Sequence, residues 1–199
     1  VMAMVREQDA RVAVAPAFDF LWGAWRMRGQ AGHWRRAAAT GIAGAVAWLA
    51  AYTPQLAAYY ALNGHFGPTH LVARKMTWSS PHFFQVLLSP EHGFFIWTPL
   101  AVIALAGLGW LAVARRQDLP PESRYLAVLA LLLVTLQVYI NGCVESWTVA
   151  GSFGQRRFVA LTPLLAVGLA AMSRAWGSKP FARVGYTLVL VGGLWWNLG

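Results

Sequence analysis

Residues 93–114, GFFIWTPLAVIALAGLGWLAVA, decide the fold class of this chain. The stretch contains no charged residue. At a rise of about 1.5 Å per residue, a helix of this length covers roughly 33 Å, which matches the hydrocarbon core of a bilayer. The stretch therefore predicts a transmembrane helix.

Other uncharged apolar stretches repeat the pattern, and they cover residues 37–61, 125–144, 158–173 and 184–199. An N-terminal stretch, residues 12–25, is also apolar but contains Pro16 and Asp19. It is a short span, a re-entrant segment or half of a helix. With 58% hydrophobic and 12% charged residues, the composition agrees with a membrane protein. We predict an all-α fold, a polytopic transmembrane helical bundle of five to six spans.

The chain has no recognisable soluble domain, low-complexity linker or repeat. We expect a single transmembrane domain over residues 1–199. The first residue is Val, and the sequence stops inside an apolar stretch. We therefore expect this domain to be a fragment of a longer protein.

The basic residues lie between the apolar stretches. The net charge of +9 would favour nucleic acid as a partner of a soluble protein, but here three basic loops, at 26–36, 115–124 and 173–183, alternate with two less basic ones at 62–92 and 141–157. The positive-inside rule places the basic loops in the cytoplasm and the other two outside. Membrane lipids, rather than nucleic acid, are the expected partners.

The first outer loop predicts a short helix on the membrane surface. Ser80 fits an N-cap and Pro81 a first helical position, and an apolar face follows over residues 83–87. Ser89 repeats the arrangement, with Glu91 placing a favourable negative charge in the first turn of the next helix.

Histidines gather in this loop, at His65, His70, His82 and His92. Their spacing differs from the three or four residues of helical metal ligands, so we predict no metal site and no cofactor. His92, beside Glu91 at a membrane boundary, suits a proton carrier or a phosphate contact, although an ordinary interfacial histidine explains it as well. The single cysteine, Cys143, excludes an internal disulfide.

The second outer loop contains VESWTVAGSFGQRRF, residues 144–158. Ser152 and Gln155 fit a capping box, which predicts a helix N-terminus at Ser152 with Arg156 and Arg157 in or just beyond its first turn. The helix dipole disfavours cations there, and the outer side is normally poor in them. An anion should compensate, either a phosphate or pyrophosphate of a ligand or the headgroups of lipids to which the arginines snorkel.

Glu145 lies at the outer end of the preceding span, close in sequence to Trp147. Its carboxylate can act as a general base toward a hydroxyl acceptor or bind a cation beside a phosphate. It can also form an ion pair with Arg156 or Arg157, which is the simpler alternative.

In order along the chain, these motifs resemble the second half of bacterial polytopic membrane glycosyltransferases of the GT-C type. The family often shows SxxHGLFxWTPL, as in SPEHGFFIWTPL here, and later an acid–Trp pair leading into SFGxRRF, as in ESWTVAGSFGQRRF. The start of the chain, AMVREQDARVAVAPAFDFL, resembles the family's LVRxQxALxxLxP.

The resemblance implies an enzyme of the bacterial cytoplasmic (inner) membrane that transfers a sugar from a polyprenyl-phosphate carrier on the outer face. The principal catalytic acid of such enzymes lies in an N-terminal outer loop, so this chain alone should be inactive. Glu145 is then the candidate catalytic residue. The candidate residues for binding the lipid phosphate are Arg156, Arg157, His92, Glu91, Gln155 and Trp147.

A second hypothesis is a non-catalytic transmembrane subunit that scaffolds a larger membrane complex. In that case the partners are other membrane protein subunits. A transporter is less favoured, because only Asp19 places a charge within an apolar stretch.

Overall fold

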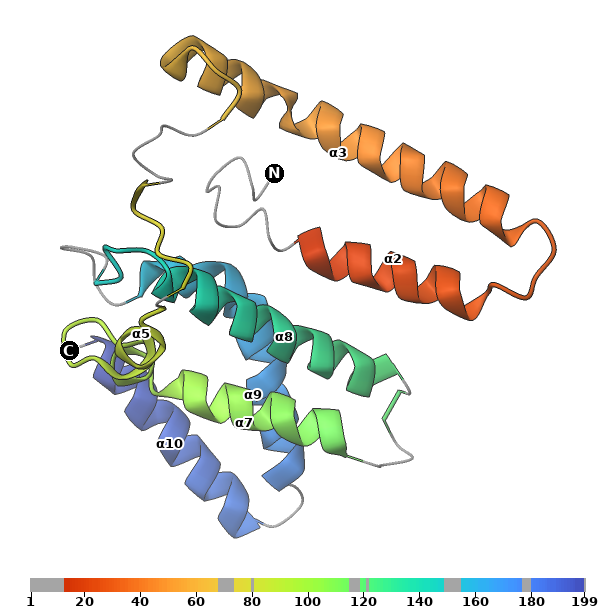
Figure 1. The fold of residues 1–199 in the computed structure, drawn as a ribbon. Helices are drawn as coiled ribbons and strands as arrows, with labels where there is room; N and C mark the ends of the chain where they lie inside the picture. The colour runs from red at the N-terminus through yellow and green to blue at the C-terminus, as the bar shows by residue number, and fades with distance from the viewer. Residues whose placement is uncertain are drawn as a thin grey trace. The chain divides into compact units, whose positions relative to one another are not determined.

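The computed structural model describes residues 13–67, 74–79, 81–114, 119–120, 122–148, 155–176 and 180–198. Within these ranges the regular structure is helical, apart from one isolated bridge between Met76 and Val144. The predicted all-α class is therefore confirmed for this part of the chain. The chain divides into two compact units, residues 1–74 and 75–199, and each is described by itself (Figure 1).

The first unit contains two helices, α2 (Val14–Arg26) and α3 (His33–Asn63), joined by a short turn. Gly41 of α3 lets Phe20 of α2 approach closely, since a Cβ atom at Gly41 would lie 3.2 Å from Cζ of Phe20. Helix α3 thus covers the apolar stretch 37–61 as expected, and α2 is helical over residues 14–26, within and just beyond the N-terminal apolar stretch. Within α3 only His33 and Tyr59 are buried.

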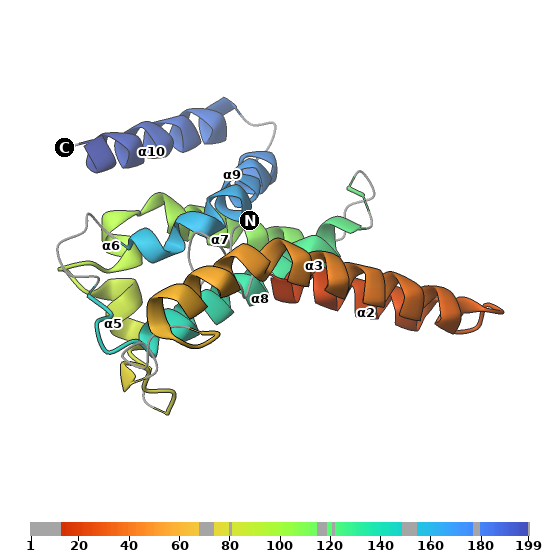
Figure 2. The same cartoon turned by 90° about the horizontal axis from the view of Figure 1, so that it is seen from above.

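The second unit contains the remaining helices. They are α5 (Phe83–Leu88), α6 (Phe94–Trp97), α7 (Leu100–Val113), α8 (Glu122–Gly142), the 3₁₀ helix η2 (Arg156–Leu161), α9 (Thr162–Trp176) and α10 (Pro180–Leu198). Helix α7 packs against both α8 and α9, and α10 packs against α9 (Figure 2).

The prediction of one continuous helix over residues 93–114 is wrong. The chain forms α6, leaves the helical conformation at Thr98 (φ −136°, ψ 70°) and resumes as α7 after Pro99. Proline has no N–H to continue the hydrogen-bond ladder, and it disfavours the helical conformation of the residue before it. The break therefore makes α6 and α7 two separate helices.

The later apolar stretches form helices near the expected positions. Two segments of the described chain, Glu122–Gly142 and Arg156–Trp176, are long and apolar enough to cross a membrane. That finding rests on length and composition, which a buried core helix also satisfies. The total of five to six spans stays a prediction.

The short helix predicted within residues 62–92 exists as α5, but it begins later than expected. Its N-cap is His82, so Pro81 is not its first helical residue, and Ser80 lies outside the described residues. Val86 is fully buried, whereas Phe84 is 77% exposed. The apolar side chains of α5 are thus divided between the core and the surface.

Helices α7 and α9 meet at two glycines. A Cβ atom on Gly107 would overlap the carbonyl oxygen of Gly168, and one on Gly168 would overlap the carbonyl oxygen of Ala104. Small residues at such a crossing let two backbones approach, which is how helices commonly associate in membranes. This contact fixes α9 against α7.

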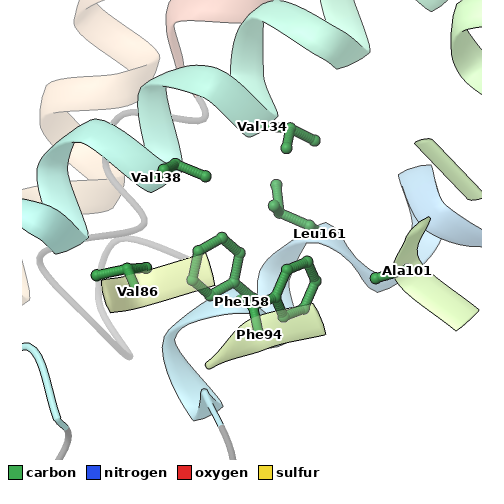
Figure 3. Packing of buried hydrophobic residues seen from close by; sticks show 7 residues of the cluster. All are labelled: Val86, Phe94, Ala101, Val134, Val138, Phe158 and Leu161. Atoms are coloured by element: carbon green, nitrogen blue, oxygen red, sulfur yellow. The ribbon is translucent and has the colours of Figure 1, made fainter. Parts of the chain in front are cut away.

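Buried side chains form two clusters in the second unit. One joins α5, α6, α7, α8 and η2 through Val86, Phe94, Ala101, Val134, Val138, Phe158 and Leu161 (Figure 3). The other joins α7, α8 and α9 through Leu111, Ala112, Ala127 and Ala171. Within the first, the rings of Phe94 and Phe158 stack with centroids 4.2 Å apart (Figure 3).

Replacing Gly107 by alanine should destabilise the second unit by about 1–3 kcal/mol, because the added methyl group meets the α9 backbone. Gly109 of the same helix has open space around its Cα. Gly109→Ala should therefore be neutral or stabilising by up to about 1 kcal/mol. Thermal unfolding of the two variants in detergent micelles tests the contact, and equal midpoints would show that it does not hold the helices together.

Candidate functional site

The end of α8 and the loop after it are held against residues 75, 77 and 82 by backbone hydrogen bonds. The N–H of Thr77 donates to the carbonyl of Cys143 at 2.7 Å, and the N–H of Glu145 donates to the carbonyl of Lys75 at 2.8 Å. Gly142 accepts a hydrogen bond from the N–H of His82 at 2.9 Å. A Cβ atom at Gly142 would lie 3.1 Å from that nitrogen, so glycine suits this position.

The start of η2 reaches the same loop. Because Phe158 stacks on Phe94, the segment that carries Arg156 and Arg157 lies against α6. The predicted helix start at Ser152 is wrong, because η2 begins at Arg156 with Gln155 as its N-cap. Ser152 itself lies outside the described residues.

Arg157 is held at both its side chain and its backbone. One guanidinium nitrogen, Nη2, lies 3.1 Å from the carbonyl oxygen of Ser146 and 3.5 Å from its Oγ, and donates to both. The carbonyl oxygen of Arg157 accepts a hydrogen bond from Nε2 of Gln137 on α8. Arg157 is half-buried, whereas its neighbour Arg156 is exposed.

Gln155 is buried, and its amide holds the loop together. Its side-chain Nε2 donates to the carbonyl of Trp147 at 3.1 Å, and its backbone carbonyl accepts from the N–H of Phe158 at 2.9 Å. Trp147 packs against the cluster around Phe158, and its ring centroid lies 6.0 Å from that of His82. Gln155 and Trp147 thus restrain the segment that carries Arg156 and Arg157.

Glu145 and Glu91 are both exposed. The N–H of Glu91 donates to Oγ of Ser89 at 3.3 Å. The prediction that Glu91 lies in the first turn of a helix is wrong, since Gly93 is the N-cap of α6. Residues 89–93 form a tight turn, in which a Cβ atom at Gly93 would lie only 2.5 Å from the backbone of Ser89.

His92 is half-buried in this turn. Its ring centroid lies 5.9 Å from that of Trp97, whose indole N–H donates to the carbonyl of Pro90 at 3.3 Å. The Nδ1 atom of His92 is buried and has no hydrogen-bond partner among the described residues. Aromatic packing therefore accounts for the position of His92.

Sequence reasoning missed two buried amides on α8. Gln137 is 1% exposed and Asn141 is 0% exposed, one helical turn apart. Both amide atoms of the Asn141 side chain lack a partner within the described ranges. The available signal was two amide residues four apart in an otherwise apolar span, because polar groups in such spans usually bind other groups inside the bundle.

The structure thus brings Arg157, Ser146, Gln155 and Trp147 together around the start of η2. The arrangement presents guanidinium groups, one restrained and one exposed, which suits an anion. Among the residues that the structure describes, no three His, Cys, Asp or Glu side chains lie together as a metal site requires. Comparison of the chain with models of protein families, with curated proteins and with solved structures finds no match.

Gln137→Met should destabilise the second unit by roughly 1–3 kcal/mol, because it leaves the partly buried carbonyl of Arg157 without its donor while keeping the side-chain length. Gln85, which is exposed on α5, offers the matched control Gln85→Met. Thermal unfolding in detergent compares the two. A Gln137→Met midpoint as high as that of the control would show that the hydrogen bond contributes nothing.

Proposed function

We propose that the chain is part of a multi-pass protein of a bacterial cytoplasmic membrane that binds the phosphate of a polyprenyl-phosphate sugar on the outer face. The observation that carries this proposal is the placement of Arg156 and Arg157 at the start of the apolar segment Arg156–Trp176. Ser146 restrains one guanidinium, and the other arginine is exposed beside it.

An arginine pair at the end of a membrane-capable helix has strong chemical preferences. Moving either charge into hydrocarbon is costly, so the pair belongs at the bilayer surface. Phosphate oxygens are the anions found at that depth, and the planar guanidinium fork binds them with two parallel hydrogen bonds. Because Arg157 is already restrained, binding there orders few additional rotamers.

Exposed apolar surface supports further spans beyond the two membrane-capable segments. Large apolar side chains are exposed along both α3 and α10, including Ile42, Val46 and Leu49 on the former and Leu188, Val191 and Leu194 on the latter. In water such continuous apolar faces would favour aggregation, whereas lipid covers them without penalty. We therefore propose that the protein crosses the membrane five to six times within residues 1–199.

Glu145 gives the proposed phosphate site its candidate catalytic group. It precedes Ser146, which binds Arg157, and its carboxylate is exposed. A carboxylate in that position suits a general base or an orienting group for a hydroxyl acceptor. Together with the order of motifs that resembles GT-C glycosyltransferases, this supports sugar transfer from the lipid carrier, with residues 1–199 supplying the lipid-phosphate side of the pocket.

Helix α3 favours a second candidate function, that of a non-catalytic transmembrane subunit. Its 31 residues bury only His33 and Tyr59 within the described structure. Helices of other subunits would cover such a surface as well as lipid does. A scaffold of this kind needs neither Glu145 nor the arginine pair for its role.

Replacing Arg156 and Arg157 together by glutamine should weaken binding of a polyprenyl phosphate by roughly tenfold or more per arginine, the usual loss for a charge-assisted hydrogen bond. Arg174, at the other end of the same helical segment, provides the control Arg174→Gln. Native mass spectrometry of the full-length protein with added polyprenyl phosphate measures the affinities. Unchanged binding in the double variant would refute the phosphate role.

Intact mass spectrometry of the native polypeptide separates the two candidate functions. A GT-C transferase needs an N-terminal catalytic half, so a mass well above 21.8 kDa is expected. A mass near 21.8 kDa, that of these residues alone, would contradict the complete transferase and favour the subunit.

A further inference from the structure

The turn between α2 and α3, taken with the helix ends beside it as residues 25–36, carries four arginines, at positions 26, 28, 35 and 36, and all four are exposed. Arg28 lies between the helices, Arg26 ends α2, and Arg35 and Arg36 lie in the first turn of α3. The sequence contains no Asp or Glu between Asp19 and Glu91. No acidic residue close in sequence therefore neutralises these charges. The turn is a compact cationic surface of the first unit.

Backbone hydrogen bonds hold the turn in one conformation. The N–H of Met27 donates to the carbonyl of Gly23 at 3.2 Å, and the N–H of Gln30 donates to the carbonyl of Met27 at 3.0 Å. Gly32 adopts a left-handed conformation, with φ of 72°, immediately before α3. That conformation is strained for other residues, so glycine directs the chain into the second helix.

Two tryptophans flank the arginines. Trp25 is 56% exposed and Trp34 is 61% exposed. The guanidinium carbon of Arg28 lies 4.0 Å from the centroid of the Trp25 ring, within the range of a cation–π interaction. This contact restrains Arg28 beside an aromatic ring, and exposed tryptophans of this kind are enriched at the headgroup level of membranes.

The helices that lead into the turn expose apolar side chains. On α2, Leu21 is 64% exposed and Trp22 is 45% exposed, and on α3 Ile42 is 65% exposed. Arginine and tryptophan therefore lie nearest the turn on both helices, and the exposed apolar residues lie further from it. This is the order that a helical hairpin inserted in a bilayer requires, with charge in the headgroups and apolar residues in hydrocarbon.

We propose that residues 25–36 bind the phosphates of anionic phospholipids, with Trp25 and Trp34 at the depth of the headgroups. The inference rests on the proposed membrane insertion but is independent of the transferase reaction. Nucleic acid would also attract the arginines, but it would leave the exposed apolar side chains of α2 and α3 in water. A lipid surface satisfies both the charges and the apolar faces.

The test measures which lipids the full chain retains. The protein is reconstituted in nanodiscs that contain phosphatidylcholine and phosphatidylglycerol, released into mild detergent, and analysed by native mass spectrometry. We expect preferential retention of phosphatidylglycerol. Replacing all four turn arginines by glutamine should weaken it by roughly fivefold per arginine, since each basic residue near an anionic surface contributes about 1 kcal/mol.

Control variants identify the source of the preference. Arg74 and Lys75 are exposed basic residues outside the turn, so Arg74→Gln combined with Lys75→Gln should leave the retention unchanged. Trp25→Leu keeps an apolar side chain but removes the cation–π partner of Arg28, and it should weaken retention by roughly two- to fivefold. Retention that is equal in the turn variant and the unmodified protein would overturn the proposal.

Further outcomes separate this proposal from others. If the chain enters bilayers but retains both lipids equally, only the turn proposal fails. If it does not enter bilayers at all, the proposed membrane function fails with it. If inorganic phosphate at millimolar concentration displaces phosphatidylglycerol, the ligand is free phosphate and the lipid proposal is overturned. If homopolymeric RNA binds tightly and this binding needs the turn arginines, the ligand is nucleic acid and the lipid proposal is again overturned.

Discussion

The stacking of Phe94 on Phe158 is the contact on which the packing of η2 against α6 depends. Phe94 begins the short helix before the break at Pro99, and Phe158 directly follows the arginine pair. Stacked aromatic rings bury a large apolar area and add a favourable geometric term. The stack therefore holds the arginine segment against α6 while the Gly107–Gly168 crossing holds the helices behind it.

The arginine pair illustrates how a charge is accommodated at the start of an apolar helix. Arg157 lies where the helix dipole disfavours a cation, and the chain compensates with the carbonyl and hydroxyl of Ser146. Gln137 satisfies the backbone carbonyl of the same residue from a neighbouring helix. Arg156, the preceding residue, is exposed, whereas Arg157 is half-buried.

Much of the helical pattern could be predicted, since long uncharged stretches lead to helices near α3, α8, α9 and α10. The break at Thr98–Pro99 carries a visible signal, Pro99, yet the apolar run around it is long enough to hide the break. The capping box at Ser152 and Gln155 predicted the wrong helix start, because Gln155 is the N-cap of η2 and not its third helical residue. A spacing of three residues permits a capping box but does not require the chain to be helical between the two residues.

By itself, the sequence determined the helical class, the basic turn at residues 26–36 and the arginine pair beside an apolar segment, because composition, charge and local periodicity are properties of neighbouring residues. Only the tertiary structure decided that Arg157 donates to Ser146, that Gln137 and Asn141 are buried, and that Phe94 meets Phe158. These contacts join residues far apart in the chain, and their geometry depends on how closely the helices pack at glycines such as Gly107 and Gly168. Packing of that kind is not encoded in any single stretch.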